Sequence, residues 1–139
     1  MFECLILGDS IAVGTHRARL ECVAYARSGI NSQQFNKQYP GEFFANSVVI
    51  SLGTNDHKFV KTEQELENLR KRIVAKGRVI WILPSSKPEI SSIVSNVAEK
   101  YGDMVLAPHP QYMSKDGIHP TGTGYRWLAS FTEAFGSNK

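Results

Sequence analysis

The chain has 139 residues, of which 42% are hydrophobic and 21% are charged, and 16 basic against 13 acidic residues give a formal net charge of +3. This composition is ordinary for a soluble globular protein, and no apolar stretch approaches the ~20 residues that a membrane span needs. No basic stripe interleaved with aromatic residues is present, so nucleic acid is not an expected partner. The length fits one domain, which we expect to span residues 1–139.

Apolar runs alternate with longer amphipathic stretches, which is the pattern of an α/β sheet. In chain order, we predict strands over residues 2–7, 21–26, 47–52, 78–83 and 104–107. We predict helices over residues 11–19, 32–37, 62–75, 89–101 and 121–135. Five strands with helices between them favour a flavodoxin-like, three-layer αβα fold with a parallel sheet in the order 2-1-3-4-5. Only residues 136–139 are expected to fray.

Three polar segments stand at the ends of predicted elements. They are Gly8-Asp9-Ser10 after the first strand, Gly53-Thr54-Asn55-Asp56 after the third strand, and Asp116-Gly117-Ile118-His119 before the last helix. Right-handed crossovers place the carboxyl ends of parallel strands at one edge of the sheet, where ligands bind. We therefore expect these segments to converge there. Taken alone, the first segment is better explained by Asp9 and Ser10 capping the following helix.

Together the three segments supply the groups that an acyl transfer needs. A serine hydroxyl is a poor nucleophile until a base removes its proton, and His119 is the histidine with a carboxylate at a spacing suited to a local turn. Asp116 would accept the second ring N–H and fix the tautomer. Asn55 can donate a hydrogen bond to an oxyanion, and Gly29 permits a close approach of backbone.

In these blocks and in their order, the chain resembles the SGNH (GDSL-type) hydrolase family. The matching residues, which span nearly the whole chain, are Gly8-Asp9-Ser10, Gly29, Gly53-Thr54-Asn55-Asp56, and Asp116 with His119. The resemblance implies the flavodoxin-like fold and a serine esterase that works through a Ser10-His119-Asp116 triad and an acyl-enzyme, without a cofactor. It also implies an oxyanion hole formed by the backbone N–H groups of Ser10 and Gly29 and the side-chain amide of Asn55.

The family includes carbohydrate O-deacetylases, lysophospholipases, thioesterases and arylesterases, and the fold does not decide among them. Because only residues 33–46 leave length for a lid, we expect hydrolysis of short-chain O-acyl esters, such as an acetylated carbohydrate. The alternatives are a lysophospholipase or thioesterase of the same family and a catalytically inactive carbohydrate-binding module. An inactive module is expected to have lost a triad member, whereas all three are present.

Other residues receive more open interpretations. The candidate substrate-binding residues, which fall in expected loops near the same edge, are His57, Phe59, Phe43, Phe44 and Tyr112. Asp9 and Asp56 are expected to hydrogen-bond their own turns. Cys4 and Cys22 are interpreted as two buried free thiols. No histidine pair has ligand spacing with a carboxylate, so we expect no metal site.

The first residues lack the basic region and cleavage site of a signal peptide and are predicted to be a strand. We therefore expect a cytoplasmic or otherwise soluble protein, with a trimmed leader left open. The expected partner is a small-molecule or carbohydrate ester, and the sequence does not define the oligomeric state.

Overall fold

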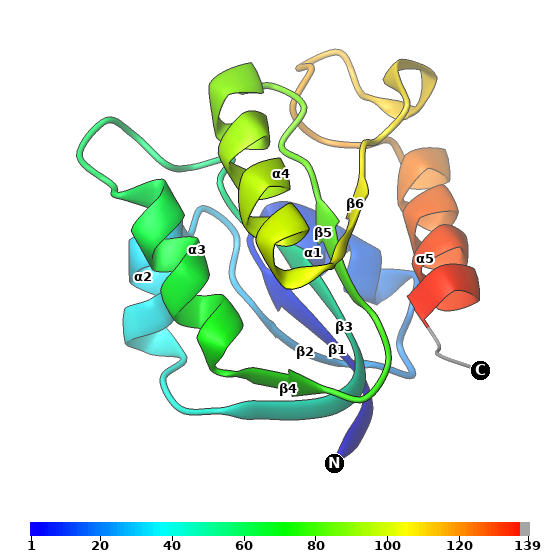
Figure 1. Ribbon diagram of the computed structural model, residues 1–139. Coiled ribbons are helices and arrows are strands. Elements are labelled where there is room, and N and C mark those ends of the chain that lie inside the picture. Colours follow the sequence, from blue (N-terminus) through cyan, green and yellow to red (C-terminus); the bar gives the residue numbers. More distant parts are fainter. Residues whose placement is uncertain (137–139) are drawn as a thin grey trace.

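The computed structural model describes residues 1–136 as a parallel β-sheet with helices on both faces (Figure 1). The sheet contains β1 (Phe2–Gly8), β2 (Val23–Ala26), β3 (Phe43–Ser51), β5 (Val79–Ile82) and β6 (Met104–Leu106) in the spatial order β2-β1-β3-β5-β6. Every pairing is parallel. The predicted three-layer fold and strand order are therefore confirmed. The fraying expected of residues 137–139 lies outside the described residues, and residue 136 ends the last helix.

The helices divide into two layers that cover opposite faces of the sheet (Figure 1). One layer holds α1 (Ser10–Arg17) and α5 (Gly122–Gly136), and the other holds α2 (Ser32–Gln38), α3 (Thr62–Lys71) and α4 (Pro88–Tyr101). Successive side chains of a strand point to opposite faces, so Leu5 and Leu7 enter the core under α2 to α4 while Ile6 enters the core under α1 and α5. Burial on both faces explains the continuous apolar runs of the strands.

Local caps fix where two of the helices begin. The Asp9 carboxylate accepts a hydrogen bond from the Ile11 backbone N–H at the start of α1. At α2, Asn31 and Gln34 form a reciprocal capping box. Among residues 1–136, the structure has no helix long and apolar enough to cross a membrane.

One strand was not predicted. The helix expected over residues 62–75 ends at Lys71, and β4 (Ile73–Ala75) then pairs with the beginning of β3. Ile73 follows Leu66 and Leu69 at helical spacing, which hides the strand in the sequence. The chain turns at Arg72, whose guanidinium donates to the carbonyl oxygens of residues 39 and 41. β3 therefore begins at Phe43 and not at the predicted residue 47, and its residues 43–45 pair with β4.

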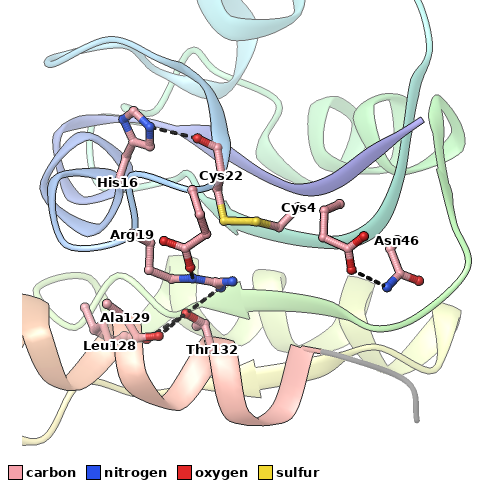
Figure 2. The surroundings of a disulfide bond; sticks show 10 residues. Cys4, His16, Arg19, Cys22, Asn46, Leu128, Ala129 and Thr132 are labelled. Atoms are coloured by element: carbon pink, nitrogen blue, oxygen red, sulfur yellow. Dashed lines mark hydrogen bonds and ion pairs between the residues drawn. A yellow bond between two sulfur atoms is a disulfide. The ribbon is translucent and has the colours of Figure 1, made fainter.

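The interpretation of Cys4 and Cys22 as free thiols is wrong, because the two residues form a disulfide (Figure 2). The register pairs Leu5 with Val23, so the preceding residues lie side by side, Cys4 on β1 and Cys22 just before β2, with their Cα atoms 4.9 Å apart. The sequence does not reveal this pairing, because it depends on the register between β1 and β2. The disulfide joins β1 to the segment that leads into β2.

Candidate active site

The turn between β1 and α1 places Ser10 at the carboxyl edge of the sheet. Gly8 has φ +143°, and a Cβ at this position would overlap the carbonyl oxygen of Ser51 on the neighbouring strand. The same carbonyl accepts a hydrogen bond of 3.0 Å from the Asp9 backbone N–H. A glycine is thus needed at Gly8 both for its backbone angle and for the close approach of β3. Ser10 follows as the first residue of α1.

Ser10, His119 and Asp116 lie in one hydrogen-bonded row. Oγ of Ser10 lies 2.9 Å from Nε2 of His119, and Nδ1 of His119 lies 2.9 Å from Oδ2 of Asp116. With the ring proton on Nδ1, that nitrogen donates to Asp116, and Nε2 accepts from the Ser10 hydroxyl. Ser10 is half-buried, whereas the side chains of His119 and Asp116 are 41% and 46% exposed. The row joins two ends of the chain that only the fold brings together.

The second oxygen of Asp116 organises the loop that carries His119. Oδ1 accepts hydrogen bonds from the backbone N–H groups of Ile118 and His119 and from the Ser114 hydroxyl. The hydrogen bond from the His119 ring, followed by these bonds, holds the pKa of Asp116 well below its usual range. Asp116 is therefore ionised, as a carboxylate that orients an imidazole must be.

Asp9 is the second carboxyl group beside Ser10, and it lies in a different environment. Its side chain is fully buried, and Oδ1 accepts from the Ile11 backbone N–H and from the Ser51 hydroxyl. Burial raises the pKa of Asp9 to about 6. Asp9 hydrogen-bonds its own turn, as the sequence suggests, and it points into the core, away from a reacting group.

Besides Ser10, the residues expected to form an oxyanion hole are Gly29 and Asn55, which lie on two loops that are bonded to each other. The Asn55 side-chain nitrogen donates to the carbonyl oxygen of Ile30 at 3.0 Å. Ile30 directly follows Gly29, whose φ of +82° favours glycine and which has open space where a Cβ would be. A primary amide has two N–H donors, so one remains on Asn55 for a ligand. The bond holds Asn55 beside the segment that carries Gly29.

Asp56 differs from its expected role, because it bonds other segments instead of its own turn. Its carboxylate accepts from the Ser32 backbone N–H at 2.9 Å and from the Thr62 hydroxyl at 2.8 Å. Its carbonyl oxygen accepts from Nζ of Lys87. Asp56 thus fixes the loop after β3 to the beginnings of α2 and α3. The sequence did not point to Ser32, Thr62 or Lys87, because these contacts depend on how the layers pack.

The candidate substrate-binding residues fall into three groups. His57 and Phe59 lie in the exposed loop after Asn55, with Phe59 77% exposed. Tyr112 is half-buried in the same connection between β6 and α5 that carries His119, and it stacks on Trp127 with ring centroids 5.4 Å apart. Phe43 and Phe44, expected in a loop near the site, instead begin β3, about 23 to 26 Å from its carboxyl end at about 3.3 Å per residue. They lie at the opposite edge of the sheet and do not reach Ser10.

A cleft of about 430 Å³ opens between the loop after Asn55 and the beginning of α4. Its apolar lining comes from Val60, Ile90 and Ile93, and its charged lining includes Lys58 and Lys87. The sequence analysis missed this cleft because it forms only when α4 packs beside the loop. Gly53 allows that packing, since a Cβ there would lie 2.7 Å from the Ile90 side chain. Among residues 1–136, no group of three or more His, Cys, Asp or Glu side chains could hold a metal ion.

The comparisons with known proteins place this fold. No family model matches the chain, and no curated protein matches it. Solved structures do match. A candidate acylhydrolase from Bacteroides fragilis superposes with a TM-score of 0.68 at 18% identity, over 96% of this chain and 86% of that chain. A candidate GDSL-like lipase from Bacteroides uniformis gives 0.69 at 14% identity, over 95% and 94%. The C-terminal catalytic domain of peptidoglycan O-acetyltransferase A from Streptococcus pneumoniae gives 0.59 at 16% identity, over 96% and 91%.

The chain therefore has the fold of the SGNH (GDSL-type) hydrolases, as its sequence motifs suggest. At these identities the likeness is one of fold. Function rests on the site itself.

Proposed function

We propose that residues 1–139 form one catalytic domain, a serine hydrolase of carboxylic esters in which Ser10 is the nucleophile. The observation that carries the proposal is the row Ser10-His119-Asp116, with both hydrogen bonds at 2.9 Å. Nucleophile, base and orienting carboxylate stand in the order and at the distances that acyl transfer requires. The proposed roles are nucleophile for Ser10, base for His119 and orienting carboxylate for Asp116.

In the proposed reaction, Oγ of Ser10 attacks the ester carbonyl carbon while its proton passes to Nε2 of His119. The tetrahedral intermediate collapses by breaking the bond to the alcohol oxygen, which takes the proton from His119 and leaves. A water molecule then attacks the acyl-Ser10 carbonyl, with His119 again as the base, and releases the acid and the Ser10 hydroxyl. Asp116 stays ionised and stabilises the imidazolium that forms in each half.

The oxyanion would receive hydrogen bonds from the backbone N–H groups of Ser10 and Gly29 and the free N–H of Asn55. Two observations support this part of the proposal. The N–H groups in the first turn of α1 have no acceptor within the helix. The Asp9 side chain accepts from one of them, the N–H of Ile11. The bond from Asn55 to Ile30 holds the amide beside the Gly29 segment before a substrate binds.

We further propose that the substrate is a short-chain O-acyl ester, such as an acetylated carbohydrate. The exposure of His119 and Asp116 supports this, because an open edge can accept an ester carried by a bulky alcohol. One of the structural neighbours is a peptidoglycan O-acetyltransferase domain, and another is an arylesterase from M. smegmatis. A lysophospholipase or thioesterase is the alternative, which the apolar part of the cleft beside Asn55 would favour.

The disulfide bears on where the protein works. Disulfides persist in oxidising compartments and are rare in the cytoplasm. The sequence suggests a cytoplasmic or otherwise soluble protein, and of these the Cys4–Cys22 bond supports an oxidising compartment outside the cytoplasm.

The test is Ser10→Ala, compared with Ser92→Ala on the exposed surface of α4. We expect Ser10→Ala to abolish both the hydrolysis of para-nitrophenyl acetate and labelling by a fluorophosphonate probe, while the far-UV spectrum stays unchanged. Ser92→Ala should keep both activities. Labelling that persists in Ser10→Ala would falsify the nucleophile assignment. A wild-type protein that neither hydrolyses esters nor accepts the probe would be the inactive module instead.

A further inference from the structure

The loops around Ser10 carry charge of nearly one sign. Four loops of more than one residue follow strands at the carboxyl edge of the sheet, at residues 27–31, 52–61, 83–87 and 107–121. Apart from Asp116, every Lys, Arg, Asp or Glu side chain in these loops that is not buried is basic. These side chains are Arg27, Lys58, Lys61, Lys87 and Lys115.

No carboxylate of the described residues pairs with the basic side chains of this edge. Within residues 1–136, none of the five forms an ion pair. Arg19, Arg70 and Lys100, which lie outside these loops, each pair with a carboxylate. An unpaired cation at a binding edge attracts an anion without first giving up a partner.

The carboxylates near this edge that are not buried are fewer than its cations. Asp56 also lines the cleft, but its side chain is buried, and both of its oxygens accept hydrogen bonds from Ser32 and Thr62. Three carboxylates that are not buried follow these loops: Glu63 and Glu65 in the first turn of α3, and Glu89 in the first turn of α4. With Asp116 they make four carboxylates against the five cations.

The cleft beside Asn55 gives two of these cations a place to act. Lys58 and Lys87 both line it, with His57 and Glu89 as its other exposed ionisable side chains. Nζ of Lys87 is held by the Asp56 carbonyl oxygen at 2.6 Å, so its charge stays at the cleft. A volume of about 430 Å³ falls in the range of small-molecule sites. His57 lines the cleft and stands two residues after Asn55 in the same loop. The Cα atoms of His57 and Asn55 therefore lie within about 7 Å of each other.

We propose that the ester hydrolysed at Ser10 is borne by an anionic alcohol, an acidic carbohydrate or a similar carboxylate-bearing molecule, whose negative group is recognised by Lys58 and Lys87. This inference rests on the proposed function and adds its substrate class. The apolar floor of the cleft accepts the body of the group next to the ester, and the lysines accept its charge.

The experiment compares two acetyl esters that differ in charge, para-acetoxybenzoate and the neutral para-acetoxybenzamide. The measured quantity is the ratio of their kcat/KM values, because differences in leaving group cancel when one ratio is compared between variants. We expect Lys58→Gln to lower the ratio of anionic to neutral ester by about 2- to 3-fold, as the loss of one charge at about 6 to 8 Å in a water-like medium implies. Raising the salt to about 0.3 M should lower the wild-type ratio in the same direction.

Two further variants test the sign and the position of the effect. Glu89→Gln removes a negative charge from the same cleft and should raise the ratio. Lys76→Gln removes an exposed lysine that follows β4 at the other edge of the sheet, and it should leave the ratio unchanged. Lys87→Gln should behave as Lys58→Gln, with thermal unfolding as a check because Lys87 also bonds the loop.

The outcomes separate the two proposals. If the neutral ester is hydrolysed in a Ser10-dependent manner but the ratio responds neither to Lys58→Gln nor to Glu89→Gln, the anionic substrate is excluded and the esterase stands. A ratio that changes equally in Lys76→Gln also excludes recognition by the cleft, leaving only the net charge of the protein. If neither ester is hydrolysed, the proposed function itself fails.

Discussion

The two halves of the candidate triad are held in place by different forces. Ser10 stands on a turn whose neighbours, Gly8 and Asp9, are buried in the core and contact β3. Asp116 and His119 stand on an exposed loop that is held by its own hydrogen bonds. Packing therefore sets the position of the nucleophile, while local polar contacts set the position of the base. Substitutions around Ser10 should change stability first, and substitutions around His119 should change chemistry first.

The same contrast appears in the two carboxyl groups beside the site. Burial raises the pKa of Asp9 to about 6, whereas hydrogen bonds from His119 and its neighbours lower the pKa of Asp116. The two groups therefore make opposite contributions to stability as the pH changes.

The largest expected effect is on the chemistry of the exposed half. In Asp116→Asn, an amide replaces the carboxylate that orients His119, and its N–H₂ group favours the wrong ring tautomer. We expect kcat for para-nitrophenyl acetate to fall by about 1,000- to 10,000-fold, with the chain still folded. Steady-state kinetics and thermal unfolding check this together. Loss of folding in parallel with activity would show that the loop, like the turn at Ser10, depends on Asp116 for its structure.

The next largest effect is on the stability of the buried half. In Gly8→Ala, the new Cβ overlaps the Ser51 carbonyl oxygen, and φ is positive as well. We expect the free energy of unfolding to fall by at least about 4 kcal/mol, measured by denaturant titration. The matched control is Gly41→Ala, which also has a positive φ but open space around the Cβ, and which should cost only about 1 to 2 kcal/mol. Equal losses in both variants would mean that strain alone, and not the contact with β3, makes Gly8 necessary.

Sequence patterns located the fold better than they located the surroundings of the site. The strand order and the helices follow from alternating apolar and amphipathic runs, and the motifs at Ser10, Asn55 and His119 stand where strands or helices begin or end, so topology alone brings them to one edge. Contacts that depend on register or on packing between layers were not readable. They include the Cys4–Cys22 disulfide, strand β4 and the cleft beside α4. Phe43 and Phe44 were misplaced for the same reason, because the length of β3 was hidden.

A third effect tests whether the buried half depends on the disulfide. Cys4→Ala with Cys22→Ala removes a link between residues 18 positions apart, which should lower the free energy of unfolding by about 3 kcal/mol through the entropy of the unfolded chain. Because Cys4 lies four residues before Gly8 along β1, about 13 Å away, kcat should stay within about 2-fold. Denaturant titration with and without reductant checks the wild type against the variant. Reductant that leaves the wild type as stable as before would contradict the expected contribution of the disulfide.

The smallest effect is the dependence of stability on pH at Asp9. The pKa of Asp9 is about 6 in the folded protein and 3.8 as its reference value, so the folded state binds the proton more tightly. Stability from this group is fully present below the reference pKa and is lost as the pH rises through the folded pKa. Between pH 4 and pH 7, the wild type should therefore lose about 2 kcal/mol relative to Asp9→Asn, which cannot ionise.

The sign of this effect distinguishes the two halves of the site. Asn at position 9 keeps an oxygen to accept from Ile11 and Ser51, so the comparison isolates the charge. The stability of the wild type relative to Asp116→Asn should change with pH in the opposite direction. The folded pKa of Asp116 is lowered, so the contribution of Asp116 to stability is lost as the pH falls. Chemical denaturation of the three proteins at about pH 2.5, 4, 5.5 and 7 measures both slopes, because the contribution of Asp116 is lost only below its reference pKa of 3.8. Slopes of the same sign for the two variants would show that Asp9 is ionised in its buried position and that the contrast between the two carboxyl groups does not exist.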